Sequence, residues 1–225
     1  MIASPTQVIH PHVRLGADVS LDDFVVLGKP PRGAGPDGPE LVIGDGAIIR
    51  GFTTIYAGTT IGARVQTGHN VMIREDNQIG EGTIIGTGSV LEYGNRIGAR
   101  VRVHSRCFLE WVTIEDDVIV APGVTFTDDP HPPCPRYSEC VGGATVRRLA
   151  KIGAAATIMP GIEIGARSLV ASGSVVTKDV PERAVVAGNP ARVVADVDSL
   201  TCKVGLYEHP YEWEPESPHF KGTPA

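Results

Sequence analysis

Histidine is the residue type in this chain best suited to proton transfer near neutral pH, because its ordinary pKa is about 6.5. Two of the seven histidines stand in surroundings that favour chemistry. His69 occurs in the segment TGHNVMIRE, and His131 occurs in FTDDPHPP. We predict that one of them is a general base, and that Asp128 or Asp129 orients the His131 ring or binds substrate.

Polar neighbours of His69 extend this hypothesis. Asn70 and Glu75 flank His69 in the sequence, and we expect them to bind an acceptor molecule or to orient a ring. His104, in RVHSRC, is expected on the same face as His69 and is a weaker candidate. The remaining histidines are predicted to be structural, since no other chemical group converges on them: His10, His12, His209 and His219.

Three cysteines raise the question of a metal. Cys134 and Cys140 are six residues apart, and Cys202 lies near the C-terminal end, so the three could bind zinc together with a histidine. The spacing is not that of a usual zinc finger, however, and we expect free thiols and no metal, with a disulfide as a further alternative. Four cysteines are too few for a disulfide scaffold in a chain of this length, which indicates a reducing, cytoplasmic location.

Charge and hydropathy exclude several classes of partner. Twenty basic and 26 acidic residues give a net charge of −6, which argues against nucleic acid or an anionic membrane. No window approaches the roughly 18 apolar residues of a membrane span, and the first residues do not resemble a signal peptide. A small-molecule partner is therefore expected.

A six-residue period runs along most of the chain. From Ile43 to Leu109 every sixth residue is aliphatic, with Thr67 as the exception, and the period continues on both sides to a total of 24 hexads. Six residues match neither an α-helical face nor a heptad. Short strands separated by bends match it, and three hexads would close one triangular coil. The sequence therefore predicts a parallel β-helix of about eight coils, roughly 35–40 Å tall.

Two interruptions and a tail complete the expected organisation. We expect one β-helix domain over residues 1–195, with inserted loops at about 29–41 and 128–150, the second of which should contribute to a site. Residues 196–225 are rich in Pro, Glu and aromatics and are expected to form an extended tail. The tail is expected to cover the open end of the helix or a neighbouring subunit, with disorder of its last ten residues as an alternative.

The hexads resemble the hexapeptide-repeat family, whose members fold as left-handed parallel β-helices and are mostly acyltransferases that use acetyl-CoA. The segment SGSVVTKDVPERAVVAGNPAR resembles the ending of galactoside, maltose and amino-sugar acetyltransferases, where the last coils form the CoA groove. The resemblance places Ala154 and Ser172 in the pantetheine slot. It places Thr177, Lys178 and Arg192 near the nucleotide, where cationic side chains suit phosphates.

The same resemblance supports both histidines. The segment around His69 is similar to the GH-x-V segment of UDP-N-acetylglucosamine acyltransferases and bacillosamine-type sugar acetyltransferases, in which the turn histidine is the base. The segment around His131 is similar to the T-x-x-HP segment of galactoside and maltose acetyltransferases, although DDP before it and Pro-Pro-Cys after it depart from that pattern. The family builds its sites between subunits of a trimer, so a homotrimer is implied.

The resemblance thus implies an acyl-CoA-dependent acyltransferase with acetyl-CoA or another acyl-CoA as co-substrate. We expect N-acetylation of an amino sugar, nucleotide-linked and used in polysaccharide biosynthesis, by direct transfer with a histidine base. O-acetylation of a sugar or glycan hydroxyl and a non-catalytic β-helix scaffold are the alternatives. A zinc hydratase of the γ-carbonic-anhydrase kind is disfavoured, because the sequence lacks the histidine spacing of that family.

Overall fold

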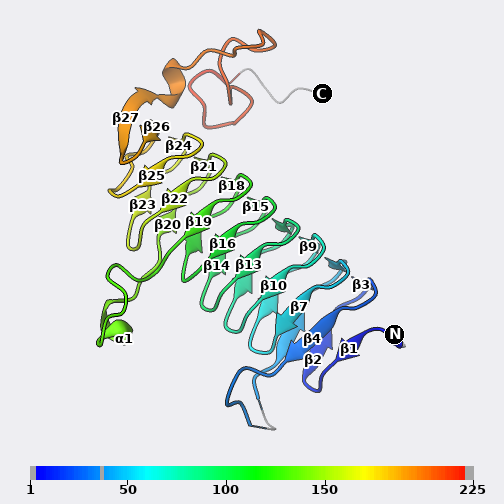
Figure 1. Ribbon diagram of the computed structural model, residues 1–225. Helices are drawn as coiled ribbons and strands as arrows, with labels where there is room; N and C mark the ends of the chain where they lie inside the picture. The colour runs from blue at the N-terminus through cyan, green and yellow to red at the C-terminus, as the bar shows by residue number, and fades with distance from the viewer. Residues whose placement is uncertain (1–3, 36–37, 221–225) are drawn as a thin grey trace.

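The computed structural model describes residues 4–35 and 38–220, and over these residues the chain is a left-handed parallel β-helix, as predicted (Figure 1). The described chain forms three sheets of nine, eight and ten strands. Sheet A comprises β1 (Val8–Ile9), β4 (Val26–Lys29), β7 (Thr54–Tyr56), β10 (Met72–Ile73), β13 (Val90–Leu91), β16 (Phe108–Leu109), β19 (Thr125–Phe126), β22 (Thr157–Ile158) and β25 (Val175–Val176).

The other two sheets have the same ladder order. Sheet B comprises β2 (Val13–Leu15), β5 (Leu41–Ile43), β8 (Thr60–Ile61), β11 (Gln78–Ile79), β14 (Arg96–Ile97), β17 (Thr113–Ile114), β20 (Thr145–Val146) and β23 (Glu163–Ile164). Sheet C comprises β3 (Ser20–Leu21), β6 (Ile48–Ile49), β9 (Gln66–Thr67), β12 (Ile84–Ile85), β15 (Arg102–Val103), β18 (Ile119–Val120), β21 (Lys151–Ile152), β24 (Leu169–Val170), β26 (Ala184–Gly188) and β27 (Ala191–Asp196). Each coil visits A, B and C in turn, and the corners are named here by the sheets they join.

The hexad residues fill the interior of the prism. Ile55, Ile73 and Leu91 stack on successive strands of sheet A and are fully buried. Thr67, the exception in the sequence pattern, is also buried, and its hydroxyl oxygen accepts a hydrogen bond from the backbone N–H of Arg50 at 3.0 Å. The polar side chain is therefore accommodated because its oxygen has a partner.

The loops are slightly shorter than expected. The first joins β4 to β5 over residues 30–40, and the second joins β19 to β20 over residues 127–144 and carries helix α1 (Tyr137–Cys140). Strand β20, with Val146, pairs with both β17 and β23, so a hexad that the sequence analysis assigned to the loop belongs to the helix. Val146 lies six residues before Ile152. With its hexad included, the β-helix has nearer nine coils than the eight predicted.

Glycines after the hexad residues allow the coils to approach one another. A Cβ atom on Gly80 would lie 2.5 Å from the carbonyl carbon of Gly98 in the next coil. The left-handed backbone conformation falls two residues later, at Gly82 (φ +68°) and Arg100 (φ +55°). These hexad glycines are thus required by contact between coils, and the bends themselves accept other residue types.

The C-terminal segment packs on the flank of the prism. Strands β26 and β27 form an antiparallel hairpin, followed by the 3-10 helix η1 (Val197–Ser199) and a series of turns up to residue 220, where an extended tail was expected. Lys151, which points outward from sheet C, is held there: its Nζ lies 2.5 Å from a Glu214 carboxylate oxygen and 4.2 Å from the Tyr211 ring centroid. Residues 221–225 lie outside the described residues. Over the described chain, no helix has the length and apolarity needed to cross a bilayer.

Two buried asparagines hold the A–B corner. Asn95 Nδ2 donates to Asn77 Oδ1 at 2.8 Å, and Asn95 Oδ1 accepts from the backbone N–H of Val112 at 3.0 Å. Both side chains are fully buried, so each hydrogen bond replaces one to water. This ladder of hydrogen-bonded asparagines fixes the turns of the A–B corner. Charged residues described below project from these turns.

We expect Asn95→Ala to lower the free energy of unfolding by about 1–3 kcal/mol, because it leaves the buried Val112 N–H without an acceptor. Urea denaturation followed by circular dichroism measures this. Gln78→Ala, an exposed position on the same sheet, is the control and should change stability by less than about 0.5 kcal/mol. Equal stabilities of the two variants would contradict the role assigned to the ladder.

Candidate functional site

The C–A corner aligns several of the residues predicted from sequence. His69 follows β9, His104 follows β15, and Ala154 and Ser172 follow β21 and β24. Ala154 and Ser172 occupy adjacent coils, joined by a hydrogen bond from Gly173 N–H to the Ala154 carbonyl oxygen at 2.8 Å. His69 lies four coils from Ala154, roughly 19 Å at 4.8 Å per coil, and His104 lies halfway between them.

His69 borders a hollow at the N-terminal end of this corner. The described residues lining the hollow also include Ser4, Gln7, Leu21, Asp22, Asp23, Phe24, Gly51 and Phe52. Phe24 and Phe52 stack with ring centroids 5.0 Å apart and are 52% and 61% exposed. His69 packs close to Gly51, since a Cβ there would lie 3.6 Å from the ring Nδ1. The hollow thus combines an imidazole, an aromatic platform and carboxylates.

Local contacts fix the two carboxylates of this hollow. An oxygen of Asp22 lies 3.7 Å from an Arg50 guanidinium nitrogen, and the other accepts from Gly51 N–H at 3.3 Å. Asp23 accepts from the Thr6 hydroxyl at 2.5 Å. Each contact leaves further acceptor capacity on a carboxylate that faces the hollow.

The A–B corner carries a separate row of charges. Arg74, Glu92, Glu110 and Asp128 are each 18 residues apart and follow four successive strands of sheet A. Arg74 bridges Glu92 at 2.6 Å and Glu75 at 2.8 Å.

Glu75 therefore belongs to the A–B corner. The expectation that it shares the corner region of His69 is wrong within one chain, because strand β10 separates the two residues. Asn70, with φ +56°, stays in the turn beside His69.

Partly buried hydrogen bonds attach the second loop to this row. Asp128 is buried and accepts from the Tyr137 hydroxyl at 2.5 Å, and Tyr137 is in turn 2.7 Å from the Tyr93 hydroxyl. Burial and the bond to Asp128 raise the pKa of Tyr137. Burial, followed by the charge of Asp128 and a hydrogen bond to it, raises the pKa of Glu110 to about 7. Glu110 therefore retains a proton at pH values where a free glutamate has lost it.

His131 lies in the second loop, three residues after Asp128, and away from His69. Its backbone N–H donates to Asp129 Oδ1 at 2.9 Å, and its ring is exposed. The ring nitrogen and the sulfurs of Cys134 and Cys140 lie within 4.8 Å of one another, whereas Cys202 is outside this group. A hydrogen bond between the two loop thiols raises the pKa of Cys140 to about 11. Within one chain, His69 and His131 occupy different corners.

The predicted nucleotide-binding residues lie near the C-terminal end. Lys178 and Arg192 line one hollow of about 130 Å³ together with Val176 and Val193, and Thr177 is exposed between β25 and Lys178. This hollow presents two cationic side chains beside apolar surface. It is separated from Ala154 and Ser172 by strand β25.

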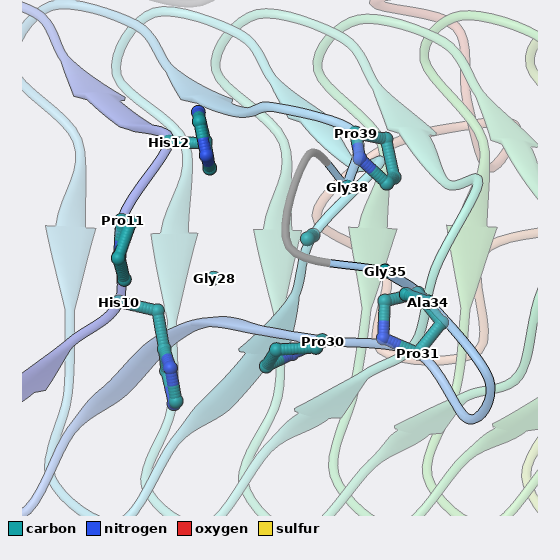
Figure 2. A pocket seen from close by; sticks show the side chains of 11 residues that line it. His10, Pro11, His12, Gly28, Pro30, Pro31, Ala34, Gly35, Gly38 and Pro39 are labelled. Carbon is teal, nitrogen blue, oxygen red and sulfur yellow. The ribbon is translucent and has the colours of Figure 1, made fainter.

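The histidines expected to be structural have mostly structural surroundings. His209 and His219 stack at 3.7 Å, and their rings contact the backbone carbonyls of Leu200 and Asp198. His10 and His12 line a cavity of about 360 Å³ under the first loop (Figure 2), together with Pro11, Gly28, Pro30, Pro31, Ala34, Gly35, Gly38, Pro39 and Ala57. No acidic residue, lysine or arginine is among the described residues that line it.

The sequence analysis did not identify the row of charges at the A–B corner or the stacked pair of Phe24 and Phe52. The 18-residue spacing of Arg74, Glu92 and Glu110 was visible, since 18 residues make one coil. Phe24 and Phe52 are 28 residues apart, which becomes one coil once the first loop is subtracted. Searching outward-facing positions for coil-spaced repeats would have found both.

Comparison with known proteins agrees with the fold and repeats. Residues 58–93 match the family model of the bacterial transferase hexapeptide, six repeats. Galactoside O-acetyltransferase of Escherichia coli K12 is 37% identical over 91 residues, 39% of this chain and 45% of that protein. A 2,3,4,5-tetrahydropyridine-2,6-dicarboxylate N-acetyltransferase of Clostridium perfringens is 54% identical over 50 residues, 22% of this chain and 21% of that protein.

A solved structure extends the likeness to most of the chain. The UDP-N-acetylglucosamine acyltransferase of Bacteroides fragilis superposes with a TM-score of 0.57 at 17% identity, over 87% of this chain and 74% of that one. The chain spans less than half the length of the curated relatives described above. The chain has the left-handed β-helix fold, matches the hexapeptide-repeat family model over residues 58–93, and is similar to acetyltransferases.

The raised pKa of Glu110 predicts a pH-dependent stability. Between its ordinary pKa of 4.5 and about 7, Glu110 retains in the folded state a proton that the unfolded chain releases, so the free energy of unfolding falls as pH rises through this range. The surrounding charges are Asp128, Glu92 and Arg74. We expect Glu110→Gln to make the fall shallower and to be more stable than the unmodified protein at about pH 8.

Urea unfolding at a series of pH values measures this effect. Glu182→Gln, an exposed site, serves as the control and should leave the pH profile unchanged. A profile for Glu110→Gln that parallels that of the unmodified protein would refute the raised pKa of Glu110.

Proposed function

We propose that this protein is an acetyl-CoA-dependent acyltransferase that N-acetylates an amino sugar, with His69 as the general base. The observation that carries the proposal is that Ala154, Ser172 and His69 lie on one corner of the prism. A CoA arm extended along this corner from the C-terminal coils points toward His69. The acetyltransferase names of the curated relatives support the reaction class.

The two ends of the proposed site have complementary chemistry. At the C-terminal end, Lys178 and Arg192 supply the positive charge that suits the phosphates of CoA. At the other end, Asp22 and Asp23 attract a cationic amine, and the exposed Phe24–Phe52 pair offers an apolar platform for a sugar ring. This combination favours an amino sugar over an anionic acceptor.

The reaction that follows is direct transfer. His69 takes a proton from the acceptor nitrogen, which then attacks the thioester carbonyl carbon. A backbone N–H stabilises the oxyanion of the tetrahedral intermediate. The C–S bond breaks as the C–N bond is completed, and the departing thiolate takes up a proton, so that an amide and free CoA are formed. Histidine is suited to the first step because both of its protonation states are accessible near neutral pH.

The proposal also includes a homotrimer with sites between subunits, a small-molecule acceptor and a cytoplasmic location. Four free cysteines in the described chain support a reducing compartment. Within this proposal, the acceptor is a nucleotide-linked amino sugar used to build a surface polysaccharide. O-acetylation of a sugar hydroxyl is the second candidate, supported by the name of the galactoside O-acetyltransferase relative.

A thiol-release assay tests the proposal directly. Acetyl-CoA is supplied with nucleotide-linked amino sugars, free amino sugars and the matching sugars in which the amine is replaced by hydroxyl. Release with an amino sugar and not with its hydroxyl counterpart supports N-acetylation. Release with the hydroxyl sugars alone would establish O-acetylation, and silence with every acceptor despite CoA binding would contradict the proposal.

His69→Ala should lower kcat/KM by about 10²–10⁴, because the acceptor amine then lacks its base. His104→Ala is the matched control, since it removes an exposed histidine from the same corner two coils away. We expect that variant to lose less than about tenfold. A large loss in His104→Ala together with near-normal rates in His69→Ala would transfer the base to His104.

Lys178→Ala and Arg192→Ala should each raise KM for acetyl-CoA, by about tenfold for a lost charged hydrogen bond, and leave kcat little changed. Steady-state kinetics with acetyl-CoA measures the split between kcat and KM. Acetyl-pantetheine, which lacks the nucleotide, is the matched substrate, and both variants should use it as well as the unmodified protein does. Equal losses with both substrates would place the phosphates elsewhere.

A further inference from the structure

The tip of the second loop gathers three side chains that the proposed acyl transfer does not use. A ring nitrogen of His131 and the sulfurs of Cys134 and Cys140 all lie within 4.8 Å of one another. The three residues come from a ten-residue stretch, with Cys140 at the end of α1. Loop residues that diverge from the coil would not converge in this way unless the loop folds back on itself.

The separation of these atoms suits a tetrahedral metal ion. Zinc–sulfur bonds of about 2.3 Å and zinc–nitrogen bonds of about 2.0 Å place neighbouring ligand atoms roughly 3.5–3.8 Å apart. A group whose atoms already lie within 4.8 Å needs only a small contraction to bind the ion. The fourth position is left for a water molecule.

The donor set selects among metals. Two thiolates and an imidazole are soft to intermediate ligands, which favour zinc over magnesium or calcium. Binding releases the two thiol protons to solvent, and the neutral imidazole keeps its other ring proton. Zn²⁺ and two thiolates then sum to zero charge, so the exposed loop gains no net charge.

The loop is also anchored on the side that leads back to the prism. The Tyr137 hydroxyl donates to the buried Asp128 carboxylate at 2.5 Å, and Gly142 N–H donates to the Asp128 carbonyl oxygen at 3.0 Å. Where the loop rejoins the coil, a Cβ on Gly143 would lie 2.1 Å from the Trp111 carbonyl oxygen. Both ends of the loop are therefore fixed.

We propose that His131, Cys134 and Cys140 form a zinc site that closes the tip of the second loop. In this arrangement His131 is a metal ligand, and its metal-bound nitrogen does not act as a base. The site is independent of the acyl-transfer proposal, because its ligands lie at the A–B corner and His69 lies at the C–A corner. The metal replaces a packed core in a segment too short to have one.

Metal analysis of the full-length protein tests the site. The protein is stripped with a chelator under reducing conditions, titrated with Zn²⁺, and its bound metal measured by mass spectrometry, with Co²⁺ as a spectroscopic substitute. We expect about one metal ion per chain and a thiolate-to-cobalt absorption band. His131→Ala, Cys134→Ser and Cys140→Ser should each lower Zn²⁺ affinity by at least about tenfold.

Cys202→Ser is the matched control, because this cysteine lies outside the group, and it should retain full metal content. Circular dichroism of each variant checks that the prism is intact. The cobalt spectrum is recorded on the unmodified protein, so this part of the test stands even where a variant fails to fold. Absence of stoichiometric Zn²⁺ or Co²⁺ binding overturns the proposal. A Cys134–Cys140 disulfide in the protein as purified, detected by mass after alkylation, would also overturn it.

Discussion

Close axial stacking of the coils is the constraint on which the rest of the structure depends. Strands of two or three residues cannot hold a sheet alone, and each gains its hydrogen bonds from the coils above and below. Residues such as Gly80 and Gly98 must lack a Cβ for this stacking to occur. Once the coils are stacked, an outward-facing residue in a coil without an insertion has a neighbour about 18 positions away, as Met72 and Val90 do, and functional side chains are placed by the coil period.

The fold was predictable because the residues that repeat every six positions are the buried ones. Ile55, Ile73 and Leu91 repeat without variation in kind, and even Thr67 keeps its interior position through a hydrogen bond. Val146 was missed because it directly follows the irregular segment that ends in Gly142, Gly143 and Ala144, so its hexad was assigned to the loop. Handedness came from resemblance to a known family, since the hexads alone do not specify it.

The candidate site was predictable only in part, because corners are set by three-dimensional register. His69, Ala154 and Ser172 share a corner, as a consistent count of hexads implies. Glu75 follows His69 by six residues and therefore lies on the next corner, although the sequence suggested a neighbour. The Tyr137–Asp128 bond and the gathering of His131 with two cysteines depend on how an irregular loop folds, which no period encodes.

The antiparallel hairpin of β26 and β27 has a consequence for assembly. Every other strand pair of sheet C runs parallel, and an open parallel edge is a template on which another chain could add coils. Because β27 reverses direction, an incoming coil would meet an edge of the wrong polarity. The hairpin therefore works against continuation of sheet C by another parallel coil at that edge.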